Sequence, residues 1–141
     1  MGKVLVLLGP TASGKTKLSI QLAKELDGEI VSADSMQVYK YMNIGTAKPD
    51  SKEMSGIRHY LIDEIEPCQE FSVAQYQKLA LEYIKKILEK GKLPIVVGGT
   101  GLYINSLVYN INYSKTVSDW ELRERLKDAA DKNGNEHLHE K

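Results

Sequence analysis

Three short apolar runs along the chain are nearly continuous rather than alternating with polar residues. They are "KVLVLLG" (3–9), "EIVSAD" (29–34) and "LPIVVGG" (93–99). Continuous runs of this length are typical of strands that are buried on both faces of a parallel sheet. A weaker run, "HYLIDEI" (59–65), is a further candidate for the same sheet. The pattern therefore predicts three parallel strands and proposes a fourth.

Helical periodicity fills the intervals between these runs. Leu18, Leu22 and Leu26 recur every four residues and predict the apolar face of a helix, with Gly28 as its stop signal. A second helix begins at a capping box and ends at Gly91. Its box is Ser72 with Gln75, and its apolar face consists of Tyr76, Ala80, Tyr83, Ile84, Ile87 and Leu88. Strands that alternate with helices predict an α/β fold in which helices flank a parallel sheet.

The pattern changes after Gly101. The stretch "LYINSLVYNINYSKT" has no clear period, and Ser118 with Glu121 then forms another capping box. The helix that it starts would run through Leu126 toward Ala130. We therefore divide the chain into an α/β core, residues 1–110, and the start of a helical insertion, residues 111–141.

The composition of the chain bears on its size class, its partners and its cellular compartment. The 141 residues are 42% apolar, which is enough for one domain with a core, and 19 basic residues balance 19 acidic ones. The net charge of the chain therefore gives no indication of a nucleic-acid or membrane partner. Cys68 is the single cysteine, so no internal disulfide can form, and no signal peptide or membrane-length run is visible. We expect a soluble, cytoplasmic monomer.

A glycine-rich loop follows the first predicted strand directly. Its spacing, Gly-x4-Gly-Lys-Thr between a strand and a helix, is that of a P-loop, whose backbone amides curl around a di- or triphosphate. Lys15 would add a charge at the terminal phosphates, and the Thr16 hydroxyl would ligate Mg²⁺. The predicted phosphate site comprises Gly9, Pro10, Thr11, Ala12, Ser13, Gly14, Lys15 and Thr16.

Two features bear on which phosphate compound binds. ATP-hydrolysing P-loop enzymes usually carry an acid at the end of a later strand, whereas the run 93–99 ends in glycines. Asp34 follows the second predicted strand, at the rim where open α/β sheets bind ligands, and could act as a general base. A P-loop small-molecule kinase that uses ATP, and a nucleotide-dependent switch, both remain open at this point.

Longer motifs carry a specific resemblance. The segments "GPTASGKT", "SADSMQVYKYMNIGTAKP", "RHYLID", "FSVAQYQ" and "VGGTGLYINSL" occur in this order. In these motifs the chain closely resembles the tRNA dimethylallyltransferases, over essentially its whole length. Arg58 and Gln75 depart from residues that are common in the family. Family members are about twice as long, so the chain resembles their N-terminal half.

The resemblance implies a function for each motif. The loop would hold the diphosphate of dimethylallyl diphosphate with Mg²⁺, and the dimethylallyl group would pass to the N6 amine of the adenine next to the anticodon of tRNA. Asp34 would be the general base for that amine. The resemblance assigns tRNA contacts to Asp34, Ser35, Met36, Gln37, Thr100 and Arg123. Lys48, in "GTAKP", would either contact phosphate or cap a turn.

Overall fold

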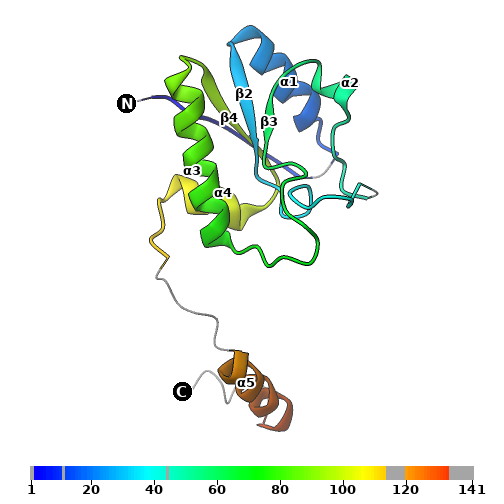
Figure 1. The fold of residues 1–141 in the computed structure, drawn as a ribbon, viewed down its shortest axis with the longest axis vertical. Helices are drawn as coiled ribbons and strands as arrows, with labels where there is room; N and C mark the ends of the chain where they lie inside the picture. The colour runs from blue at the N-terminus through cyan, green and yellow to red at the C-terminus, as the bar shows by residue number, and fades with distance from the viewer. Residues whose placement is uncertain (1, 11, 44, 114–119, 134–141) are drawn as a thin grey trace. The chain divides into compact units, whose positions relative to one another are not determined.

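The computed structural model describes residues 2–10, 12–43, 45–113 and 120–133. The chain divides into two compact units, Met1–Ile111 and Asn112–Lys141, and each unit is described by itself. The first unit contains the sheet and all the helices that pack on it (Figure 1).

Four parallel strands form the sheet in the described part of the chain. They are β1 (Leu5–Leu8), β2 (Gly28–Ser32), β3 (His59–Tyr60) and β4 (Leu93–Gly98), in the spatial order β1-β4-β2-β3. The three predicted strands are confirmed, and the fourth run also contributes a strand. That strand ends after two residues because Leu61 and Asp63 adopt positive φ angles of 62° and 55°, which are incompatible with an extended chain.

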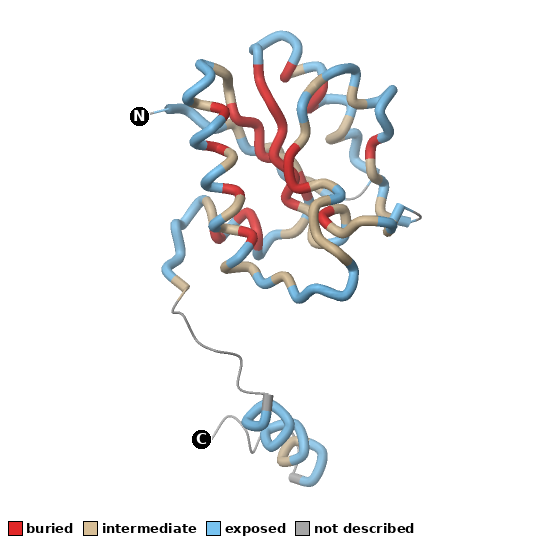
Figure 2. Tube along the Cα trace, viewed as in Figure 1, coloured by how far each residue is buried: buried red, intermediate tan, exposed pale blue. Residues whose placement is uncertain are grey.

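Helices cover both faces of the sheet. Ile30 packs with the buried face of α1 (Lys15–Glu25), whereas its neighbour Val31 packs with α3 (Val73–Glu89). Because successive side chains of a strand point to opposite faces, α1 and α3 lie on opposite sides (Figure 1). The buried residues gather along the central strands and the inner sides of these helices (Figure 2). The predicted fold, a P-loop-type parallel sheet flanked by helices, is confirmed.

The predicted face of the first helix is right at one of its three positions. Leu22 packs against the buried cluster of α1, but Leu18 and Leu26 are exposed, and α1 buries Ser19, Ile20 and Ala23 against the sheet. Gly28, predicted as the stop signal of the helix, is the first residue of β2. A side chain at this position would collide with Leu93 and Ile95 of the neighbouring strand, so glycine is required by close strand packing.

Burial on both faces holds for the centre of the sheet and fails at its edge. All five residues of β2 are buried, but Val6 and Leu8 of β1 are 39% and 59% exposed. Strand β1 is an edge strand in the described sheet, and only its Leu5 side packs against the cluster of α1. The uniform apolar run therefore does not reveal which strand lies at the edge.

The remaining helices differ in how well they were predicted. Ser72 and Gln75 form the predicted capping box of α3, which buries Tyr76, Ala80, Ile84 and Ile87. The short helices α2 (Ser51–Met54) and α4 (Gly101–Val108) were not predicted. Among the described residues, no helix is long and apolar enough to cross a bilayer.

The second unit contains α5 (Trp120–Asn133), which confirms the helix predicted through Leu126 toward Ala130. The capping residue Ser118 lies outside the described residues. The assignment of residues 111–141 to a helical insertion, and the tRNA contact that the resemblance assigns to Arg123 within it, stay predictions.

A buried carboxylate stabilises the end of the sheet away from the C-terminal edges of its strands. Glu29 of β2 is 7% exposed, and it accepts hydrogen bonds from the Tyr60 hydroxyl (2.8 Å) and the Lys90 ammonium (3.1 and 3.2 Å). Burial alone would raise the pKa of Glu29, but these hydrogen bonds and the charges of Lys90 and Lys92 outweigh it and lower the pKa. The ionised form is therefore favoured by folding.

Glu29→Gln should reduce the free energy of unfolding at pH 7 by about 1–2 kcal/mol, since it removes a charge-assisted bond in a buried position. The pKa of Glu29 is depressed on folding, so its contribution is present above the ordinary value of 4.5 and is lost as pH falls through the lowered value. Denaturant melts from pH 7 to 3 should show the two proteins converge. Glu89→Gln, at an exposed carboxylate, is the matched control. A difference that stays constant with pH would contradict this account.

Candidate functional site

A cavity of about 1150 Å³ opens at the C-terminal edge of the sheet. Its walls come from the connections that follow β1, β2 and β4, together with the outer face of α1 and the segment from 46 to 55. Parallel strands present their carboxyl ends at one edge, where α/β proteins bind ligands. The topology therefore brings the phosphate loop and the Asp34 turn into one pocket.

The predicted phosphate-binding loop, residues 9–16 and called the phosphate loop below, forms one end of this pocket. Gly14 has φ of 83° and stands at the N-cap of α1, so glycine is needed for the turn that leads into the helix. The Lys15 ammonium donates to the Pro10 carbonyl (2.5 Å) and the Ser13 hydroxyl (3.3 Å), and Ser13 donates to the same carbonyl at 2.6 Å. The loop thus closes on itself with its cation beside the helix N-terminus, an arrangement that suits an anion.

Most of the predicted phosphate residues line the cavity: Pro10, Ala12, Ser13, Gly14, Lys15 and Thr16. Gly9 does not line it, and its carbonyl oxygen is 3.1 Å from the position that a Cβ on Gly99 would occupy. Thr11 lies outside the described residues.

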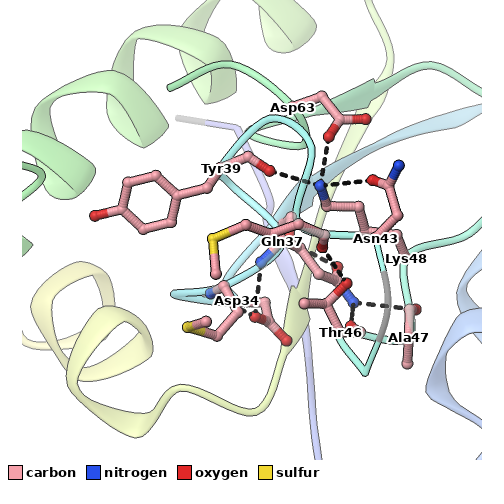
Figure 3. A network of polar contacts seen from close by, with 11 residues as sticks. Asp34, Gln37, Tyr39, Asn43, Thr46, Ala47, Lys48 and Asp63 are labelled. Atoms are coloured by element: carbon pink, nitrogen blue, oxygen red, sulfur yellow. Dashed lines mark hydrogen bonds and ion pairs between the residues drawn. The ribbon is translucent and has the colours of Figure 1, made fainter. Parts of the chain in front are cut away.

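The Asp34 turn forms the opposite part of the pocket. Oδ1 of Asp34 accepts the backbone N–H groups of Met36 (2.8 Å) and Gln37 (3.0 Å), which fixes the carboxylate on its own turn (Figure 3). Among the described residues, no group donates to the second oxygen, Oδ2. That oxygen can therefore accept a proton from a ligand in the pocket.

Strand β4 supports this turn through its glycines. A Cβ on Gly98 would lie 2.1 Å from the Ala33 carbonyl oxygen, so only glycine permits the approach of the two strand ends. Thr100 then donates its N–H to the Ala33 carbonyl (3.1 Å) and accepts the Ser35 N–H on its hydroxyl (3.0 Å). The predicted residues Asp34, Ser35, Met36, Gln37 and Thr100 all line the cavity.

An aromatic pair packs behind the Asp34 turn. The rings of Tyr76 and Tyr103 stack at 4.0 Å, and the Tyr76 hydroxyl donates to the Ser32 carbonyl at 3.0 Å. Burial raises the pKa of the Tyr103 hydroxyl, and the charges of Tyr39 and Asp34 add to the rise. The Tyr103 hydroxyl therefore stays protonated at neutral pH and does not act as a base.

A divalent cation at this site would need oxygen ligands from the protein or from its ligand. No group of three or more His, Cys, Asp or Glu side chains that could hold a metal occurs within the described ranges. The Thr16 hydroxyl, on the first turn of α1, borders the cavity next to Lys15. Mg²⁺ is commonly held by one or two protein oxygens with substrate phosphates and water. The residues fit a cation that arrives with a diphosphate, and they do not fit an all-protein cage.

The cavity also contains residues that the sequence analysis did not assign. Its walls include Lys17, Gln21 and Lys24 of α1, and Thr46, Ala47, Glu53 and Ser55 of the opposite segment. The i, i+4, i+7 spacing on α1 could have indicated one polar face, but no local signal identifies the opposite wall. Arg123 lies in α5, in the second unit, so the structure does not place it with the other predicted residues.

Several proteins resemble this chain closely in sequence. A tRNA dimethylallyltransferase of Acetivibrio thermocellus is 66% identical over 141 residues, which is 100% of this chain and 45% of the relative. The corresponding protein of Alkaliphilus oremlandii is 56% identical over 139 residues, covering 99% of this chain and 44% of the relative. The chain therefore spans less than half the length of these relatives.

Solved structures agree with the sequence relatives. The full-length tRNA isopentenylpyrophosphate transferase of Bacillus halodurans superposes with a TM-score of 0.80 at 46% identity, covering 99% of this chain and 46% of that one. A eukaryotic dimethylallyltransferase described as acting on tRNA gives a TM-score of 0.74 at 37% identity, over 86% of this chain and 29% of that one.

Fold and site together define a P-loop-type α/β protein in which a phosphate loop and an acidic turn share one pocket. The model of the IPP transferase family matches residues 37–141, which begin at Gln37, the last residue of that turn, and cover well over half of the chain. The chain belongs to the IPP transferase family.

Gly98→Ala should damage both the fold and the pocket, because the new methyl group would overlap the Ala33 backbone. We expect a loss of about 1–3 kcal/mol in the free energy of unfolding, as for an overpacked interior. Gly101→Ala is the matched control, because a Cβ there meets nothing within 4 Å. Thermal melts of the two variants provide the measurement. Equal melting temperatures would show that the strand ends can separate without cost.

Proposed function

We propose that this chain provides the diphosphate-binding and proton-accepting core of a tRNA dimethylallyltransferase. The reaction transfers the dimethylallyl group of dimethylallyl diphosphate to the N6 amine of the adenine next to the anticodon in tRNA. The observation that carries the proposal is the single cavity that contains both the phosphate loop and Asp34. Membership of the IPP transferase family and the names of the relatives support it.

The phosphate loop acts on the leaving group. As the bond between the allylic C1 and the diphosphate oxygen breaks, negative charge grows on that oxygen. Backbone amides at the start of α1 and the Lys15 ammonium, which lies beside the pocket on the Pro10 carbonyl, stabilise this charge. When bound through the diphosphate and the Thr16 hydroxyl, Mg²⁺ supplies further neutralisation of the departing diphosphate.

Asp34 acts on the acceptor. The N6 lone pair forms the new C–N bond, and the proton that N6 then releases passes to the free oxygen of Asp34, while the diphosphate leaves with the electrons of the C–O bond. An exocyclic amine is too weakly acidic to lose its proton beforehand, so the base must act as the bond forms. The Met36 and Gln37 amides occupy Oδ1, which leaves Oδ2 of this cavity-lining residue to accept the proton.

The adenine must leave its stack to reach this position. Ser35, Met36 and Gln37 line the cavity beside Asp34, and Met36 is 44% exposed, so it offers apolar surface to a flipped base. Thr100 and Arg123 complete the proposed tRNA contacts. Family membership supports this reaction over a kinase that phosphorylates a small molecule. A monomeric state and a cytoplasmic location stay predictions.

The central test is Asp34→Asn in an enzyme of full length, for example a chimaera that joins residues 1–141 to the remaining length of the Acetivibrio thermocellus relative. Asparagine can keep the two hydrogen bonds to Oδ1 but cannot accept the proton. We expect the rate of label transfer from dimethylallyl diphosphate to tRNA to fall by about two to four orders of magnitude. The Kd for dimethylallyl diphosphate should not change.

Asp27→Asn is the control, at an exposed carboxylate that does not line the cavity. If Asp34→Asn weakened diphosphate binding and left the rate of the bound complex intact, Asp34 would be a structural or metal-holding residue instead.

A further inference from the structure

The side chain of Lys48 carries a buried ammonium group that has no part in the proposed reaction. Its side chain is only 5% exposed, and its ammonium donates to the Tyr39 carbonyl (2.5 Å), the Asn43 Oδ1 (3.1 Å) and the Asp63 Oδ1 (2.5 Å). An ammonium has three N–H groups, so these acceptors use all of them. Lys48 does not line the cavity. It therefore neither contacts a phosphate in the pocket nor simply caps a turn.

The three acceptors come from different parts of the chain (Figure 3). Tyr39 and Asn43 lie in the segment that follows the Asp34 turn, whereas Asp63 follows β3, the edge strand on the other side of β2. Asp63 also donates its backbone N–H to the Gln37 carbonyl at 3.1 Å. Lys48 and Asp63 thus join the segment after the turn to the segment after β3.

Gln37 connects this junction to the pocket. Its amide nitrogen donates to the carbonyls of Thr46 (2.9 Å) and Ala47 (3.2 Å), and its own backbone N–H donates to Asp34. Thr46 and Ala47 line the cavity, and Ala47 immediately precedes Lys48. One wall of the pocket is therefore held on one side by Gln37 and on the other by Lys48 (Figure 3).

The charge and burial of Lys48 favour the conformation in which its three acceptors stay together. An ammonium removed from water is costly unless it is paired and hydrogen-bonded, so conformations that separate Lys48 from its acceptors are disfavoured. Among the described residues, the phosphate loop forms no hydrogen bond with the network around Lys48 and Gln37. Its polar side chains Ser13 and Lys15 bond to Pro10 within the loop. The network can therefore influence the Asp34 side of the pocket without altering the loop.

We propose that Lys48 is a positioning residue for the acceptor adenine. By holding Tyr39, Asn43 and Asp63 together, it fixes the Thr46–Ala47 wall and, through Gln37, the turn that directs Asp34, and it takes no part in binding the diphosphate. This inference rests on the proposed function for the identity of the acceptor. The tether itself rests on the hydrogen bonds alone.

The tether is tested first in the 141-residue chain. Lys48→Met keeps most of the apolar stem and removes the ammonium. Amide hydrogen exchange should accelerate by at least roughly tenfold in residues 37–48, as expected for the loss of charge-assisted hydrogen bonds, and should stay unchanged in the helix α1. Lys40→Met is the matched control, since Lys40 lies in the same segment but pairs with Glu66 at the surface. Unchanged exchange after Lys48→Met would overturn the tether.

The positioning role is tested in the full-length chimaera described above. Lys48→Met should raise the KM for an anticodon stem-loop RNA by at least roughly tenfold, while the Kd for dimethylallyl diphosphate stays within about twofold. Asp63→Asn, which keeps an oxygen acceptor and removes only the charge, should shift KM in the same direction by less. It remains informative if Lys48→Met does not fold. In the double variant the two effects should not add, because both changes break one contact.

The results separate the inference from the proposed function. If the unsubstituted chimaera transfers no label to RNA, the proposed function fails, whatever the exchange experiment shows. If the chimaera is active and both variants leave KM unchanged, the positioning role is wrong. An increase in the Kd for dimethylallyl diphosphate equal to that in KM would also contradict it, because Lys48 would then act on the whole pocket or on the phosphate.

Discussion

The structure depends on the close approach of two strand ends, where Gly98 of β4 passes over the backbone of Ala33 after β2. No side chain fits there, since a Cβ would lie 2.1 Å from the Ala33 oxygen. The approach lets Thr100 bond to both Ala33 and Ser35, which orients the turn that carries Asp34. Gly98 thus occupies the end of β4, where ATP-hydrolysing P-loop enzymes usually have an acidic residue, and it also allows the contact that positions Asp34 after β2.

Two lysines of the same region have opposite environments. Lys15 lines the cavity and rests on carbonyl and hydroxyl groups of its own loop, so it can exchange these contacts for an anion at little cost. Lys48 is buried, and its ammonium is fully used by three acceptors within the protein. A chain with no net charge can therefore hold one cation that is open to the pocket and a second cation that is used up inside the protein.

The sequence predicted most reliably what is local. The Ser72 box and the α3 face follow from spacing within one helix, and the phosphate loop follows from a motif with its strand and helix. Features that depend on packing were missed or wrong. Of the predicted leucine face only Leu22 packs with the buried cluster, and α1 docks mainly through Ile20 and Ala23 because those side chains meet the buried strands.

The candidate site divides in the same way. Its residues on the phosphate loop and on the Asp34 turn could be predicted, because each lies in a continuous motif at a strand end. The partner of Lys48 is 15 residues away, beyond a helix and a strand, and no pattern in the chain pairs Lys48 with Asp63. The Thr46–Ala47 wall is recognisable only when the fold brings it across from α1.

The proposed function requires that the loop accept an isoprenoid diphosphate rather than ATP. Calorimetric titration of the 141-residue chain with dimethylallyl diphosphate and with ATP, each with Mg²⁺, tests this claim most directly. Lys15→Ala separates specific from unspecific binding, with Lys24→Ala, a second cavity-lining cation of α1, as its control. We expect tighter binding of dimethylallyl diphosphate than of ATP, and a larger loss of affinity with Lys15→Ala than with Lys24→Ala. Tighter binding of ATP, or equal affinity in all three proteins, would contradict it.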